Sequence, residues 1–420
     1  INYYNGLAMN YDEQGNLDAS INYKEKALAI ARNDSAQFTL NLAILYNNLG
    51  NDYMQNGQYQ KAKRHFQRAY VILNALNYKG TSMAELYESM GSLYMKRQQY
   101  DTALHYLQKG LQVCAPEFRI TNDLSNPQAG QVENKLTALH ILKSKSECLE
   151  QQFNRAGLLP FIDGAIDANL LAIGLIEELR MSTQTYESKI RIAEFEYGIF
   201  NRTIDLLAKA YHLNKDAKYS MEAFRVSERS KSSVLIAALR ELDAKEFGEI
   251  PDSLLKREAR VSKDITFYKY NLYEEQQGGN PDSTKIATWT RYLFDAQREH
   301  DELIRLFEKE FPKYYNLKYD QSIVDVKGLQ KILPSRSSLI QYSITDSLLH
   351  IFLIAKRNFH YETLALQENF ADLLQNYFEK FQHFDFSKQS MSEFTSFCWS
   401  SKSLYDYLIE PLEDKINSEN

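Results

Sequence analysis

Large, small and aromatic residues recur at a long, nearly constant spacing in the first 115 residues. Three blocks share a leucine or methionine, then a glycine or alanine, then a tyrosine three positions later: Leu7-Ala8 with Tyr11, Leu49-Gly50 with Tyr53, and Met90-Gly91 with Tyr94. Tyr53 follows Tyr11 by 42 positions, and Tyr94 follows Tyr53 by 41. Because small residues let two helices cross closely while rings fill the space where helices diverge, these blocks predict antiparallel helix pairs stacked one on the next.

The second half of each block completes the pattern. A turn is followed by a large side chain and, three positions later, by a small residue: Leu17 and Ser20, Tyr59 and Ala62, Tyr100 and Ala103. This alternation resembles the tetratricopeptide repeat (TPR), whose usual period is about 34 residues. The extra residues of the longer period lie between Ile30 and Tyr46 and between Val71 and Tyr87, so we expect lengthened helices there.

Helical periodicity resumes after a long polar loop that begins near Pro116. These later segments lack the small-residue signature, and the first four are interpreted as degenerate repeats. Apolar residues at helical spacing predict helices at about 131–153, 157–181, 184–213, 216–243, 252–276 and 283–310.

The pattern changes near residue 338. Strand-like runs at 338–344, 348–354 and 359–364, separated by short polar turns, predict a three-stranded antiparallel meander, with helices following at 367–382 and 389–410. The expected fold class is therefore mainly α: a TPR-type α-solenoid of antiparallel helix pairs, with a small C-terminal α/β portion of about three strands and two helices.

Charge and composition exclude several classes of function. A net charge of -6 and a pI near 5.9 argue against nucleic-acid binding, which needs a concentrated basic face. The apolar run at 170–176 is closely flanked by acidic residues, so we expect no membrane span. Cys114, Cys148 and Cys398 lie far apart and fit neither a disulfide framework nor a zinc site. The sequence contains neither a phosphate-binding glycine motif nor an HExxH or HxH pattern, so we expect no cofactor and no metal.

The order of elements resembles that of the TPR–CHAT family, in which a caspase-like CHAT protease domain follows a TPR array. Four groups of residues carry the resemblance. In chain order they are Ala223-Phe224 with Glu228, Lys231 and Leu235; the segment 311–319, FPKYYNLKY; Leu329-Gln330 with Leu333; and Leu404-Tyr405, Leu408-Ile409 and Pro411-Leu412.

The resemblance implies three parts: TPR repeats at 1–115, degenerate TPR-like and long helices at 116–320, and the N-terminal part of a CHAT-like α/β domain at 321–420. In the family, the catalytic His and Cys follow the helix that ends this region. We therefore expect them beyond Asn420, and we expect the 420 residues themselves to be non-catalytic.

His350, His360 and Cys398 form the one local grouping of these residue types. A caspase-type dyad needs its His and Cys at the ends of strands, so that the imidazole activates the thiolate while backbone amides hold the oxyanion. His350 instead lies inside a strand-like run, and Cys398 lies in a helical stretch beside Trp399. We interpret all three as structural residues.

The concave face of the predicted repeats is the candidate binding site. Positions pointing away from the notch-filling rings are mostly polar; with Met9, they are Asn5, Asp12, Asn47, Asn51, Gln55, Glu88, Ser92 and Lys96. Amide side chains hydrogen-bond both the N–H and the C=O of an extended peptide. The scarcity of lysines argues against a clamp for a C-terminal carboxylate.

Three functions remain open. The first is a scaffold that binds a protein or peptide partner, or an autoinhibitory segment, and regulates a CHAT-type protease. The second is the specificity arm of an active cysteine peptidase. The third is a passive spacer or oligomerisation module. The expected partner is a protein or peptide, with no nucleic acid and no membrane, and the pattern leaves the oligomeric state open.

Overall fold

The computed structural model describes residues 2–33, 39–182, 186–241, 250–277, 281–318, 325–382 and 391–417. Some side chains within these helices, including those of Asn5 and Met9, lie outside the described set. The chain forms two compact units. One comprises Ile1–Ile199 and Val234–Gln321, and the other comprises Phe200–Ser233 and Ser322–Asn420.

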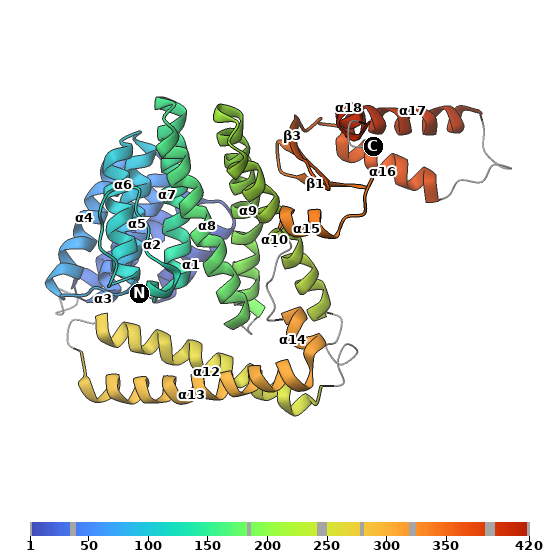
Figure 1. Cartoon of the computed structure of the whole chain (residues 1–420). Coiled ribbons are helices and arrows are strands. Elements are labelled where there is room, and N and C mark those ends of the chain that lie inside the picture. The colour runs from blue at the N-terminus through green and yellow to red at the C-terminus, as the bar shows by residue number, and fades with distance from the viewer. Residues whose placement is uncertain are drawn as a thin grey trace. The chain divides into compact units, whose positions relative to one another are not determined.

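The repeats predicted from the sequence form three helix pairs in the first unit, as Figure 1 shows in blue to cyan. Each pair joins two antiparallel helices of 12 to 17 residues. The helices are α1 (Asn2–Glu13) with α2 (Leu17–Asn33), α3 (Leu40–Gln55) with α4 (Tyr59–Ala75), and α5 (Thr81–Lys96) with α6 (Tyr100–Cys114). Helix α4 runs on past Val71, as the longer period predicted, whereas residues 34–38 of the other insertion lie outside the described residues.

Gly50 and Gly91 lie at close helix crossings, which confirms the role predicted for the small residues. A Cβ atom added to Gly50 of α3 would lie 2.4 Å from Cε1 of Phe66 in α4. One added to Gly91 of α5 would lie 2.7 Å from Cγ of Leu107 in α6. Both distances are shorter than any normal carbon contact, so only glycine fits at these two crossings.

Each helix pair also contains a triad of rings at equivalent positions. The triads are Tyr4, Tyr11 and Tyr23; Tyr46, Tyr53 and His65; and Tyr87, Tyr94 and Tyr106. In the first and third triads, the ring from the second helix is stacked at 5.4 Å and 8° on the tyrosine that follows the small residue. These offset stacks join the two helices of each pair beyond simple area burial.

A fourth helix pair, α7 (Lys135–Ala156) and α8 (Leu159–Ser182), continues the stack beside α6. The stretch Leu159–Arg180 of α8 is the one described helix that could cross a membrane by length and composition alone, with a mean hydropathy of 1.6. In the structure its isoleucines at 162, 173 and 176 are fully buried, and it packs along α7 as a core helix does.

The long loop between α6 and α7 is held in place by hydrogen bonds from a fully buried lysine. Lys145 of α7 donates hydrogen bonds from Nζ to Ser125 O at 2.7 Å, to Asn126 Oδ1 at 2.8 Å and to Leu124 O at 3.3 Å. Gln108 of α6 donates to the carbonyls of Asn122 and Ser125. These bonds satisfy buried loop carbonyls that would otherwise be left without donors.

Two long antiparallel helices, α12 (Asp252–Gln277) and α13 (Ser283–Glu310), form a hairpin followed by α14 (Pro312–Lys318). Residues near the end of α12 contact the repeat stack. Tyr78 and Thr81 donate their hydroxyls to the Glu274 carboxylate, and Tyr273 donates to Val113 O at 3.0 Å. The hairpin is thereby anchored where the second pair meets the third.

The second unit is built on a three-stranded antiparallel sheet of order β1-β2-β3. Its strands are β1 (Ser338–Ile344), β2 (Leu348–Ala355) and β3 (Phe359–Ala365), close to the predicted ranges. The helices of this part are α15 (Val326–Ile332), α16 (Phe370–Gln382), α17 (Met391–Leu408), η2 (Glu410–Leu412) and α18 (Glu413–Asn417). The predicted fold class is confirmed: a mainly helical chain with TPR helix pairs and a small antiparallel sheet.

Helices cover both faces of the sheet. Successive residues of β2 point to opposite faces and nearly all are buried, so each face packs against its own set of helices. Leu349, Ile351 and Leu353 form a core with Leu412 and residues of α17. On the other face, Phe352 lies 5.5 Å from Phe224 of α10 (Ala217–Glu241). This face is completed by the end of α9 (Tyr186–Asn214) and the start of α10.

The segment 200–233 therefore folds with the C-terminal sheet, although the sequence pattern grouped it with the degenerate repeats. Figure 1 shows α9 and α10 as continuous helices. The predicted division at residues 115 and 320 stays a prediction, because a compact unit is not the same as an independently folding domain.

Candidate functional site

The candidate binding face consists of residues on the first helix of each pair, α1, α3 and α5. Of the predicted residues, Asn5 has a side chain outside the described set. Gln55 and Lys96 are exposed at the ends of α3 and α5, and Asn51 is half-buried. The other four residues are engaged or enclosed by the fold.

Asp12 is itself exposed, but it joins an ion network whose other two members, Lys24 and Asp52, are buried. Lys24 of α2 is 8% exposed, and its Nζ lies 2.7 Å from Asp12 Oδ2 and 2.8 Å from Asp52 Oδ2. Burial raises the pKa of Asp52, and the hydrogen bond from Lys24 opposes that rise. Removing Lys24 would leave the Asp52 carboxylate buried without its counter-charge, a change that costs about 3–5 kcal/mol.

This network is not among the sites predicted from the sequence, although the repeat register contains a signal for it. Lys24 stands at the repeat position occupied by Phe66 in the second pair and Leu107 in the third. An ionisable residue at a position that is otherwise apolar indicates a buried partner of opposite charge.

Asn47 is buried in α3, with 8% of its surface exposed. Its Oδ1 accepts no hydrogen bond from the residues that the structure describes. A buried amide oxygen without a donor costs about 1–3 kcal/mol.

Glu88 and Ser92 lie together. Ser92 donates to Glu88 Oε1 at 3.0 Å, and Ser144 of α7 donates to the same oxygen at 2.8 Å. Burial raises the pKa of Glu88, and the two serine hydroxyls partly offset this rise. The contact links the third helix pair to α7, so Glu88 has a structural task besides any role in binding.

His350 is fully buried at the centre of a polar network in the second unit. An ionised carboxylate only accepts hydrogen bonds, so His350 Nε2 donates to Asp205 Oδ1, at 3.0 Å. The other ring nitrogen, Nδ1, then accepts from the Tyr361 hydroxyl at 2.8 Å. Thr345 also donates to Asp205 Oδ1, at 2.8 Å. Burial raises the pKa of Tyr361, which keeps its hydroxyl protonated as a donor.

Both ring nitrogens of His350 are thus engaged by Asp205 and Tyr361. His360 is half-buried on β3, and Cys398 is exposed on α17. Within the described ranges, three or more His, Cys, Asp or Glu residues nowhere come together in a way that could hold a metal ion. The sequence pattern gives no sign of this pairing, because Asp205 lies 145 residues away and is brought close to His350 by the fold.

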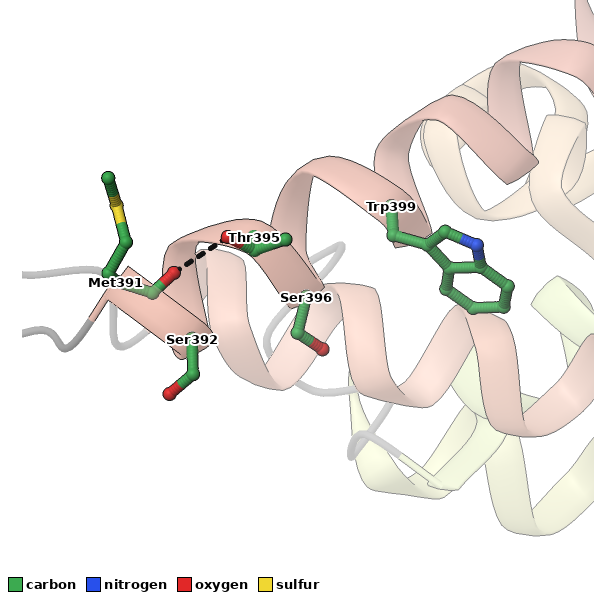
Figure 2. Close-up of a pocket in the computed structure, with 5 residues that line it drawn as sticks. All are labelled: Met391, Ser392, Thr395, Ser396 and Trp399. Atoms are coloured by element: carbon green, nitrogen blue, oxygen red, sulfur yellow. Dashed lines mark hydrogen bonds between the residues drawn. The ribbon is translucent and has the colours of Figure 1, made fainter.

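A shallow depression of about 500 Å³ lies along α17 and is lined by Met391, Ser392, Thr395, Ser396 and Trp399. Figure 2 shows these side chains along a single helix, with Thr395 donating to the Met391 carbonyl. Met391 and Trp399 are 81% and 63% exposed. The lining contains hydroxyls and apolar groups but no titratable group, so it offers neither a general base nor a nucleophile pair.

Comparison with known proteins identifies the repeats. Family models described as tetratricopeptide repeat match residues 1–34 and residues 41–115. These two ranges coincide with the three helix pairs α1–α2, α3–α4 and α5–α6. No curated protein matches the chain. The chain therefore contains tetratricopeptide repeats, which generally mediate protein–protein interaction.

Proposed function

We propose that the chain is a protein- or peptide-binding TPR scaffold that serves as the regulatory, non-catalytic part of a CHAT-type cysteine protease. The observation that carries the scaffold part is the repeated crossing at Gly50 and Gly91, together with the ring triads. This geometry sets α1, α3 and α5 at equivalent places in successive pairs, so that polar residues from three helices share one face.

The chemistry of that face fits a backbone-reading mode of binding. Asn51 and Gln55 present amides that both donate and accept. Peptides bound in an extended conformation have N–H and C=O groups that match such amides. Lys24 is shared between Asp12 and Asp52, so it offsets only part of the negative charge at this end of the face.

The CHAT part of the proposal is supported by the order of elements. The repeats and the α12–α13 hairpin are followed by α15, the three-stranded sheet, α16 and α17, as in the resemblance described above. The non-catalytic assignment is supported by His350, whose ring nitrogens are engaged by Asp205 and Tyr361. It is also supported by Cys398, which lies within helix α17 and not at the end of a strand.

Site-directed photocrosslinking tests the binding face. A photoreactive amino acid at Gln55 should capture a partner from the source cells, whereas the same group at Asn74, exposed on α4, should not capture it. The triple substitution Asn51→Ala, Gln55→Ala and Lys96→Ala, at positions with little structural role, should weaken affinity for the purified partner by about tenfold. Equal crosslinking from both positions, or unchanged affinity, would contradict binding at this face.

A cleavage assay tests the non-catalytic assignment. The chain is expected to leave a fluorogenic peptide library uncleaved, and Cys398→Ser is expected to change nothing. Cleavage that disappears in Cys398→Ser would show that the chain is itself a cysteine peptidase.

A further inference from the structure

Helix α4 carries a concentrated positive charge in a chain whose net charge is -6. Its sequence, YQKAKRHFQRAYVILNA, contains two lysines and two arginines and no acidic residue. By contrast, α2 contains Asp18 and Glu25, and α6 contains Asp101. The positive charge is therefore specific to α4 and is not shared by the equivalent helices of the other two pairs.

Three of the cations form a single exposed stripe. Lys61, Arg64 and Arg68 follow one another at intervals of three and four residues, so they share one helix face over about 10 Å. All three are exposed, and the next position on the same face is Val71, which is 56% exposed. Figure 1 shows α4 at the margin of the repeat stack.

The stripe has no internal neutralisation. Among the residues that the structure describes, no carboxylate forms an ion pair with Lys61, Arg64 or Arg68. A run of unpaired cations repels itself and lowers stability slightly, and it leaves positive charge available to attract an anionic partner.

Aromatic rings contact one cation of the stripe and two cations beside it. Lys63 of α4 lies 6.0 Å from the ring centre of Tyr94, and Arg97, at the end of α5, lies 5.9 Å from the same centre. Lys61 lies 4.9 Å from the ring centre of Tyr53. These cation–π contacts restrict the side chains without cancelling their charge, which reduces the entropy lost when an anion binds.

Acidic residues limit the stripe at the start of α4. Asp18 accepts a hydrogen bond from Asn56, in the turn before α4, at 3.0 Å. Glu25 accepts from the Tyr53 hydroxyl, beneath Lys61. The positive surface is therefore short, and an anionic chain that extended past the start of α4 would meet these carboxylates.

We propose that this α4 stripe is a second interaction surface, which binds a short acidic segment of a partner protein. Arginine forks at 64 and 68 match carboxylates bidentately, and Lys61 adds a third contact. Val71 selects an apolar side chain beyond the acidic residues. A protein segment supplies both kinds of group on one helix face, whereas the phosphate backbone of a nucleic acid supplies only charge and needs a longer basic track. The stripe lies on α4, apart from the binding face on α1, α3 and α5.

Fluorescence anisotropy with the full chain tests the proposal. The probe is a labelled peptide of about 14 residues with glutamates at helical spacing and a leucine one turn further along. It should bind at low salt and weaken as salt rises, since exposed charges are screened. Lys61→Glu, Arg64→Glu and Arg68→Glu together should weaken binding at least about tenfold, because three attractive contacts become repulsive.

Matched controls separate the stripe from net charge. Lys263→Glu, Lys327→Glu and Lys331→Glu change the net charge by the same amount at exposed positions elsewhere and should leave peptide affinity within about twofold. The triple variant of the candidate binding face, Asn51→Ala with Gln55→Ala and Lys96→Ala, should also leave peptide affinity unchanged, so this test is independent of the proposed function. Equal loss in both charge-reversal variants, no binding of the peptide, or tighter binding of single-stranded oligothymidine than of the peptide would overturn the proposal.

Discussion

At the scale of single residues, the repeat fold depends on side-chain size at the helix crossings. Gly50 and Gly91 are required because Phe66 and Leu107 occupy the space that a Cβ atom would take. The same repeat positions show how substitutions are accommodated. The position held by Phe66 in the second pair is held by Lys24 in the first. Lys24 forms ion pairs with Asp12 and Asp52. A large apolar residue and a paired lysine thus fill equivalent places by different chemistry.

Gly50→Ala should destabilise the protein by about 1–3 kcal/mol, because the new methyl group would overlap the Phe66 ring in a closely packed crossing. Gly6→Ala is the matched control. Gly6 is exposed in α1, with no atom within 4 Å of an added Cβ, so alanine should be neutral or stabilise by up to about 1 kcal/mol. Chemical denaturation followed by the helical circular dichroism signal measures both. A Gly50→Ala protein as stable as the original chain would contradict the close crossing.

At the scale of elements, polar side chains from one segment hold another in place. Lys145 of α7 fixes the loop after α6, and Glu274 and Tyr273 of α12 fix the hairpin to the repeats. The pKa of Lys145 is lowered to about 7 by burial, although Asp123 and Asp167 act in the opposite direction. Lys145 therefore changes charge near neutral pH.

The sign of the resulting pH dependence follows from proton uptake. Between pH 7 and the ordinary lysine value of 10.5, the unfolded chain binds a proton at Lys145 that the folded chain lacks. The free energy of unfolding should therefore rise with pH in this window and decrease toward pH 7, by at most about 1.4 kcal/mol per pH unit.

Comparison with Lys145→Met isolates this effect, because all other titrating groups are shared. The stability difference between the original chain and the variant should change by about 2 kcal/mol in favour of the original between pH 7 and pH 8.5. Denaturation curves at several pH values measure it. A difference independent of pH would mean that the three oxygen acceptors keep the amine charged throughout.

At the scale of the whole molecule, α9 and α10 contribute residues to both compact units. Their segment 200–233 covers one face of the sheet, through the Asp205–His350–Tyr361 network and the contact of Phe224 with Phe352. The folding of the sheet therefore depends on residues more than a hundred positions earlier.

His350→Ala should destabilise the second unit by about 2–4 kcal/mol, because the change opens a cavity and leaves Asp205 and Tyr361 without their shared partner. Hydrogen exchange should show faster exchange in β2 and in residues 200–214 together, with little change in α3 to α6. His360→Ala, half-buried on β3, is the control and should cost less than about 1 kcal/mol. Faster exchange confined to the sheet would show that segment 200–214 does not depend on it.

The sequence by itself determined the repeats, the long helices and the three strands, because these depend on local periodicity and on small residues at a fixed register. Helix ends were found within a few residues for α7 to α13. The left-handed turn residue of the third pair, Gln98, was not foreseen, although Gly15 and Gly57 mark the equivalent turns.

Only the tertiary structure decided which distant residues meet. It buried Asn47, paired Lys24 with two aspartates, gave His350 its partners and placed segment 200–233 on the sheet. Periodicity reports which face of an element is apolar, but it does not report which other element covers that face. Packing between elements far apart in the chain settles that choice, because a buried charge or amide is stable only where the fold supplies its partner.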